Sequence, residues 1–213
     1  MKTEDLIAAL AVDCAPAPSR TVSRTLGLGL ALGTVLSVAV MVLWLGVRAD
    51  LMSAMSSGPF WMKFAYALSV AALGFGLIER LARPDGEGGI SGPMLLAPLA
   101  VMTALAIYQL WGVPEEVRMS LMLGATYKIC ALNIVMLSTP IFLGLFWALR
   151  ALAPTRLTLA GAAAGVLAGA AGTFIYAFHC NESAAPFVVI WYTLGIAAVG
   201  TIGALLGRSL LRW

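Results

Sequence analysis

The stretch LGLGLALGTVLSVAVMVLWLGV, residues 26–47, decides the fold class, because it carries no charged side chain and is long enough to cross a bilayer as one helix. It is too long for a removable signal peptide and no small-residue cleavage site follows it, so we expect it to be retained. Further apolar runs of similar length lie at 61–78, 94–111, 130–149, 157–178 and 187–206. The sequence therefore predicts an all-α, polytopic membrane bundle with six transmembrane helices.

The composition excludes most other classes of protein. Hydrophobic residues make up 61% of the 213 residues and charged residues only 11%, which is too little polar surface for a soluble domain. The net charge of +3 is spread thinly, so we expect membrane lipids around the chain and no direct contact with nucleic acid. Three cysteines and one histidine exclude a disulfide scaffold and a zinc module built on CxxC.

The two faces of the predicted bundle differ in basic residues. Six crossings put both chain ends on one side, and the basic residues of that side are Lys2, Arg20, Arg24, Arg80, Arg83, Arg150, Arg156, Arg208 and Arg212. The opposite side has only Arg48, Lys63, Arg118 and Lys128. Because cytoplasmic loops are enriched in Lys and Arg, we expect a multi-pass protein of the bacterial inner membrane with both termini in the cytoplasm.

The opening MKTEDLIAALA has the pattern of a short cytoplasmic helix. Thr3 is a capping residue, and Glu4 and Asp5 lie in the first turn, where the helix dipole favours acids. The apolar side chains that share one face are Leu6, Ile7 and Leu10. So short a helix is marginal alone, and something must cover this stripe. We divide the chain into a docking segment, 1–24, and a six-helix transmembrane domain, 25–213.

The acids at the start of this helix favour a protein partner over the membrane surface. Helices that lie on membranes are rich in Lys and Arg on their polar face, and this one begins with two acidic residues. The following run APAPS, residues 15–19, predicts a stiff extended tether that holds the helix clear of the bilayer.

Two cysteines are predicted to meet at the outer face. Cys130 opens the span 130–149, and Cys180 follows the span 157–178. A tight hairpin of these spans sets residue 130 opposite about 176, so Cys180 lies within roughly a turn of Cys130. A disulfide is feasible there, and His179 and Glu182 could add ligands for a soft metal ion. The alternative is that both cysteines are small buried hydrophobes.

The predicted spans contain little other chemistry. The carboxylates fall at span ends and in loops, which weakens the hypothesis of a small metal transporter, although Tyr108, Gln109 and Asn133 keep it open. A membrane thiol oxidoreductase would need two cysteine pairs and a quinone, and only one pair exists. Gly161, Gly165 and Gly169 have the spacing of close helix packing.

Two stretches resemble a known family. MKTEDLIAALAVD at the start and FHCNESAAPFVVIWY at 178–192 are similar to the signatures of the NrsF-type negative regulators of sigma factor F, which are six-span membrane anti-sigma factors. The H-x-x-x-C-x-x-C pattern of zinc-binding anti-sigma domains is missing from the sequence.

The resemblance implies a non-enzymatic regulator of transcription. It would hold an extracytoplasmic-function sigma factor at the membrane and release it under heavy-metal or oxidative stress. The docking role falls on Thr3, Asp5, Leu6, Ile7 and Leu10. The sensing role falls on Cys130 and Cys180, with His179 as a neighbour and a third possible metal ligand. No resident cofactor is implied, only a transient heavy-metal ion at the cysteine pair.

Overall fold

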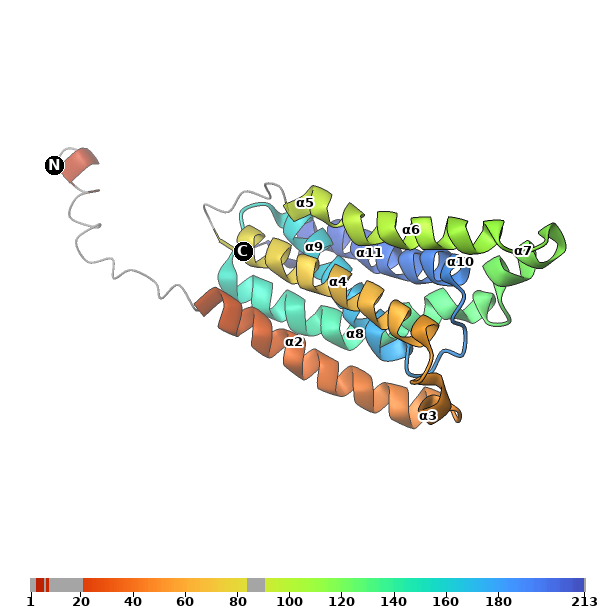
Figure 1. Cartoon of the computed structure of the whole chain (residues 1–213). Coiled ribbons are helices and arrows are strands. Elements are labelled where there is room, and N and C mark those ends of the chain that lie inside the picture. The colour runs from red at the N-terminus through yellow and green to blue at the C-terminus, as the bar shows by residue number, and fades with distance from the viewer. Residues whose placement is uncertain (1–2, 6, 8–20, 84–90, 213) are drawn as a thin grey trace.

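The computed structural model describes residues 3–5, 7, 21–83 and 91–212, which form helices and the turns between them, with no strand (Figure 1). The helices are α2 (Thr21–Val40), the π-helical η1 (Met41–Leu45), α3 (Leu51–Ala54), α4 (Gly58–Leu81), α5 (Ser91–Met94), α6 (Leu96–Trp111), α7 (Glu115–Leu123), α8 (Tyr127–Leu152), α9 (Leu157–Tyr176), α10 (Ala185–Phe187), the π-helical η2 (Val188–Tyr192) and α11 (Thr193–Leu210). The predicted fold class is confirmed.

The long helices run up and down along one axis (Figure 1). We call the end that holds α3, α10 and the turn 179–184 the cysteine end, and the end at which α2 begins and α11 finishes the arginine end. Helices α2, α4, α6, α8, α9 and α11 alternate in direction between the two ends (Figure 1). The beginning of α2 and the finish of α11 therefore share one end, as the sequence predicts.

The predicted count of six spans is met only approximately. Five helical stretches in the described part of the chain are long and apolar enough to cross a membrane: Thr21–Leu45, Gly58–Leu81, Glu115–Leu152, Leu157–Tyr176 and Ala185–Leu210. The predicted span 94–111 corresponds to α6, an apolar helix of 16 residues. Its regular part begins only after Leu95, so it is shorter than its neighbours.

Glycines bring the helix backbones together. A Cβ on Gly29 of α2 would collide with the backbone of Gly144 in α8, and one on Gly161 of α9 would collide with that of Gly203 in α11. A Cβ on Gly165 would also meet the backbone of α11. Lipid tails are as apolar as buried side chains, so the hydrophobic effect does little to hold membrane helices together. Close packing of this kind is therefore a main source of stability in a membrane bundle. The predicted packing role of the glycine repeat is confirmed.

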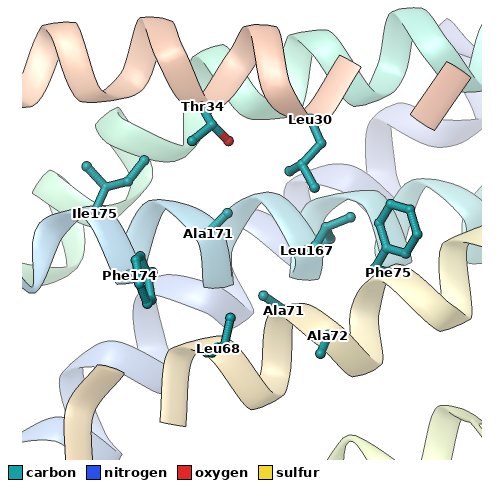
Figure 2. Close-up of a pocket in the computed structure, with 10 residues that line it drawn as sticks. All are labelled: Leu30, Thr34, Leu68, Ala71, Ala72, Phe75, Leu167, Ala171, Phe174 and Ile175. Carbon is teal, nitrogen blue, oxygen red and sulfur yellow. The ribbon is translucent and has the colours of Figure 1, made fainter. Parts of the chain in front are cut away.

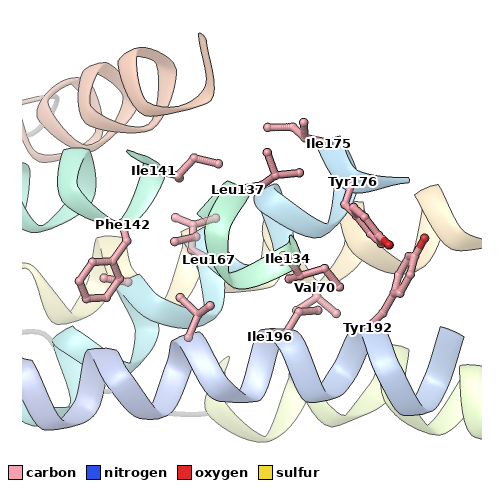
Figure 3. Packing of buried hydrophobic residues seen from close by; sticks show 14 of the residues in the cluster. Val70, Ile134, Leu137, Ile141, Phe142, Leu167, Ile175, Tyr176, Tyr192 and Ile196 are labelled. Atoms are coloured by element: carbon pink, nitrogen blue, oxygen red, sulfur yellow. The ribbon is translucent and has the colours of Figure 1, made fainter. Parts of the chain in front are cut away.

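Helix α9 lies at the centre of the bundle, where it packs against α4, α8 and α11. Figure 3 shows apolar side chains from these helices meeting, among them Ile134, Leu137, Leu167 and Ile196. Helix α8 continues through Pro140 without interruption. Nearby, the hydroxyl of Ser37 on α2 donates to the carbonyl oxygen of Leu137 at 2.7 Å, which ties α2 to α8 within the buried core.

Candidate functional site

Cys130 and Cys180 form a buried pair at the cysteine end. Their side chains are hydrogen-bonded neighbours, and Cys130 also contacts the hydroxyl of Tyr176. Both are free thiols, with exposed fractions of 0% and 2%. The predicted hairpin, with residue 130 opposite 176 and Cys180 close by, is confirmed by these contacts. The two thiols are consequently close enough to react with each other.

The turn that carries Cys180 is fastened to the chain that leaves η1. The ring Nδ1 of His179 donates to the carbonyl oxygen of Gly46 at 2.9 Å, and the backbone N–H of Arg48 donates to the carbonyl oxygen of Phe178 at 3.1 Å. Gly46 has φ of 74°, a conformation that glycine adopts readily, and it turns the chain back towards this contact. Single-turn π-helices often occur at functional sites, and here η1 leads into the site and η2 borders it.

Lys63 is a member of this site that the sequence did not reveal. The sequence places it on the same side as the two cysteines, where it does lie, but its side chain is fully buried in the second turn of α4. Its ammonium donates to the carbonyl oxygens of Cys180 at 2.6 Å and Glu182 at 3.2 Å, and it lies 5.6 Å from the centre of the Phe60 ring. A buried ammonium must be hydrogen-bonded to be tolerated, so these two carbonyls explain its position.

Arg48 is a second cation on the same turn. Its guanidinium donates to the carbonyl oxygen of Cys180 at 3.1 Å and pairs with the Asp50 carboxylate at 2.7 Å. The hydrogen bond from Arg48 lowers the pKa of Asp50, and the Asp50 carboxylate in turn raises the pKa of Arg48. The Cys180 carbonyl therefore accepts hydrogen bonds from two cations.

The surroundings of Cys180 stabilise its thiolate. The hydrogen bond from the Cys130 thiol, the nearby charge of Lys63 and the hydroxyl of Tyr192 together hold the pKa of Cys180 below its usual value, although burial opposes them. The thiolate is the nucleophilic and metal-binding form of cysteine. Cys180 is consequently the more reactive member of the pair.

Two tyrosines close the site from the bundle side. Figure 3 shows the hydroxyls of Tyr176 and Tyr192 directed towards each other at one end of the core. The Tyr192 side chain is completely buried, and its hydroxyl has no hydrogen-bond partner of good geometry in the described chain, although it lies beside Cys180. Buried hydroxyls are normally satisfied. In the sequence, the feature that pointed to Tyr192 was its position in the stretch 178–192, which resembles a family signature.

A three-ligand metal site is not assembled at this end. His179 is engaged with Gly46, and the Glu182 carboxylate accepts a hydrogen bond at 2.8 Å from the backbone N–H of Ala125. Among residues 3–5, 7, 21–83 and 91–212, no group of three or more His, Cys, Asp or Glu side chains is gathered in a way that could hold a metal ion. Any metal bound here would have only the two cysteines as ready ligands.

Of Tyr108, Gln109 and Asn133, the residues that kept the transporter hypothesis open, two make hydrogen bonds within the bundle. Gln109 accepts a hydrogen bond at 2.8 Å from the backbone N–H of Ala185, and Asn133 hydrogen-bonds the buried Tyr176. Tyr108 lies on the outside of the bundle, where 78% of it is exposed.

Most of the predicted docking helix lies outside the described residues. Of its proposed contact residues, Thr3, Asp5 and Ile7 are described, all three in helical conformation and exposed. Leu6 and Leu10 lie outside the described residues. The docking role of this segment stays a prediction.

At the arginine end, α2 and α4 are joined by a polar contact. The hydroxyl of Ser23, near the start of α2, donates to the Glu79 carboxylate at 2.6 Å. Glu79 also pairs with Arg83 at 3.2 Å. These residues are partly buried or exposed, and they lie where the docking segment joins the bundle. The contact therefore connects α4 to the root of that segment.

Comparison with known proteins gives a consistent result along the whole chain. The family described as negative regulator of sigma F, NrsF, matches residues 10–213. The chain is 39% identical to the probable anti-sigma-F factor NrsF of Azospira oryzae and 37% identical to the anti-sigma-F factor NrsF of Caulobacter vibrioides, and each match covers 100% of both chains. These are names of regulators, not of enzymes or transporters. No solved structure matches the chain.

Proposed function

The chain belongs to the family of negative regulators of sigma F, and from this premise we propose that it is a membrane-bound anti-sigma factor. It holds a sigma factor of the extracytoplasmic-function class at the cytoplasmic face of the bacterial inner membrane. It releases that factor when the outer cysteine pair meets a stress signal. The observation that carries the proposal is the full-length similarity to two anti-sigma-F factors.

The charge of the two ends supports this orientation. The arginine end has Arg24, Arg80, Arg83, Arg150, Arg156, Arg208 and Arg212 on the termini of its helices and in their connections. The cysteine end has Arg48, Lys63, Arg118 and Lys128. By the positive-inside rule, the arginine end faces the cytoplasm and the cysteine pair faces the oxidising periplasm.

The docking segment, 1–24, is the proposed contact with the sigma factor. Its expected apolar stripe of Leu6, Ile7 and Leu10 would be covered by the partner, with Thr3 and Asp5 at the helix start. The described residues at the start of this segment, 3–5 and 7, are exposed, Ile7 at 61%, which suits a surface that a partner covers. One buried Leu or Ile contributes about 1.5–3 kcal/mol to such a contact.

The cysteine pair is the proposed sensor, and its geometry favours oxidation over metal capture. The thiols are already in contact, whereas a third ligand is not gathered beside them. With a hydroperoxide as oxidant, the Cys180 thiolate attacks the O–O bond and becomes a sulfenic acid, and Cys130 then displaces water to form the disulfide. Two thiols and one hydrogen peroxide thus give one disulfide and two waters.

Co-purification tests the proposal. The wild-type chain in native membranes is expected to retain a sigma factor, and Leu6→Glu or Leu10→Glu to lose it, because a desolvated charge replaces an apolar contact. Ala8→Glu is the control, since it adds the same charge on the side of the expected helix opposite Leu6 and Leu10. Equal retention by all four proteins would exclude the stripe as the docking site, and no sigma factor on the wild type would exclude the function.

A further inference from the structure

The proposed sensor lies at the opposite end of the bundle from the docking segment, so something must connect them. We propose that Lys63 makes this connection. In this proposal, its ammonium holds the Cys180–Glu182 turn closed while the thiols are free, and it releases the turn, and with it α4, when the pair becomes a disulfide. The inference rests on the proposed function and deepens its regulation.

The contacts of Lys63 hold one turn against one helix. Its ammonium reaches from α4 to the carbonyl oxygens of Cys180, the residue that carries the reactive thiol, and of Glu182, two residues further along the chain. The only other cation on this turn is Arg48, which comes from the chain after η1 and donates to the Cys180 carbonyl in the described structure. The position of the turn relative to α4 thus depends on Lys63.

Lys63 also has an unusual charge environment. It is fully buried, and no carboxylate of the described residues lies within 4.0 Å of its ammonium. The side chain nearby that can carry a negative charge and shares its turn is Cys180. Oxidation of the pair draws the Cys180 sulfur towards Cys130, a displacement of the turn that a serine at position 180 cannot produce. The two states of the cysteines therefore differ in how well they hold the buried ammonium, and such a difference is required to shift an equilibrium.

Helix α4 connects Lys63 with the other end of the molecule. It runs the length of the bundle without a break, from Lys63 near the cysteine end to Glu79 at the arginine end (Figure 1). There Glu79 accepts the hydrogen bond from Ser23 near the start of α2. A displacement of α4 would strain this hydrogen bond between Ser23 and Glu79, at the point where the docking segment joins the bundle.

The middle of the bundle leaves room for α4 to move. Figure 2 shows a cavity of about 290 Å³ between α2, α4 and α9. Its walls include Leu30 and Thr34 of α2 and Leu68, Ala71 and Phe75 of α4. Because α2 and α4 hardly touch, and α4 packs mainly on α9, a shift of α4 relative to α2 loses few contacts between these two helices.

The test compares Lys63→Met with Lys128→Met, which removes an exposed lysine at the same end. In cells with a reporter of the sigma factor, Lys63→Met is expected to raise expression about tenfold without stress, because a charged hydrogen bond is lost. In membranes, it should also open Cys180 to a membrane-impermeant maleimide. Lys128→Met should behave as the wild type. The double variant Lys63→Met with Cys180→Ser should still release constitutively, which a Lys63 role limited to tuning the thiol would not produce.

A second pair of variants keeps the test decisive. If Lys63→Met does not accumulate, Arg48→Gln removes the other donor to the Cys180 carbonyl and should raise labelling and expression in the same direction. Ser23→Ala should raise expression without changing the labelling of Cys180. Normal levels of Lys63→Met with wild-type labelling and expression would overturn the inference. Failure of the proposed function differs, because the wild type would then retain no sigma factor while the maleimide arm would still report on Lys63.

Discussion

Tyr192→Phe removes one hydroxyl from the cysteine site and nothing else. That hydroxyl is completely buried without a hydrogen-bond partner of good geometry, and it lies beside Cys180. An unsatisfied buried polar group costs about 1–3 kcal/mol. We therefore expect the free energy of unfolding of Tyr192→Phe to equal that of the wild type, or to exceed it by up to about 1–3 kcal/mol.

The same variant should slow the oxidation of the pair. The Tyr192 hydroxyl is one of the groups that lower the pKa of Cys180, so its loss raises that pKa. A rise of one unit in that pKa is roughly a tenfold loss of thiolate on the acid side of the titration. A thiolate of higher pKa is a better nucleophile, which recovers part of this, so the net rate should fall about threefold.

The assay is disulfide formation by hydrogen peroxide in detergent-purified protein, followed by maleimide gel shift between pH 4 and pH 9. Tyr66→Phe is the matched control, because its hydroxyl is hydrogen-bonded to Thr193 at 2.6 Å. The control should lose about 1 kcal/mol of stability and keep the wild-type rate profile. A Tyr192→Phe protein that is destabilised more than Tyr66→Phe, or whose rate profile superimposes on that of the wild type, would contradict this role of the Tyr192 hydroxyl.

Three further predictions concern topology, packing and pH. Reporters fused after Trp213 or within residues 84–92 should be active in the cytoplasm and one at Asn181 in the periplasm; a cytoplasmic Asn181 would put the cysteines in a reducing compartment. Gly161→Val should reduce accumulation of the folded protein, because its side chain meets the backbone of Gly203, whereas Gly27→Val, with open space around it, should not. The pKa of Cys180 is lowered from 9.0 by folding, so its thiolate contributes stability that is full above pH 9 and is lost as pH falls through the folded pKa. The stability difference between wild type and Cys180→Ser should therefore shrink on acidification, and a difference that grows instead would contradict the assignment.

The sequence predicted the helices because apolar length is a local property. It predicted the meeting of Cys130 and Cys180 because a short connection forces α8 and α9 to pair. The length of α6 was overestimated, since hydropathy does not reveal the interruption at Leu95, which separates α5, ending at Met94, from α6. The burial of Lys63 was not predictable, because its partners, the carbonyls of Cys180 and Glu182, are brought to it by folding from the far end of the sequence.

The same limit applies to Tyr192. Its residue type suits a membrane interface as well as a buried site, and only the packing of η2 against α8 and α9 directs its hydroxyl at the cysteines. Glu182 and His179 were correctly located near the pair. Their hydrogen bonds to Ala125 and Gly46 were not predictable, because they depend on the conformation of two distant turns.

In the proposed function, one molecule holds a sigma factor and releases it when its cysteine pair is oxidised. The most direct measurement is the amount of sigma factor that sediments with membranes before and after hydrogen peroxide, in cells with the wild type, Cys130→Ser, Cys180→Ser or the double variant. Peroxide is expected to remove the factor from wild-type membranes, and all three variants are expected to retain it equally because the two residues act as a unit. The same peroxide-dependent loss in Cys180→Ser, or no sigma factor on wild-type membranes at any time, would contradict the proposed function.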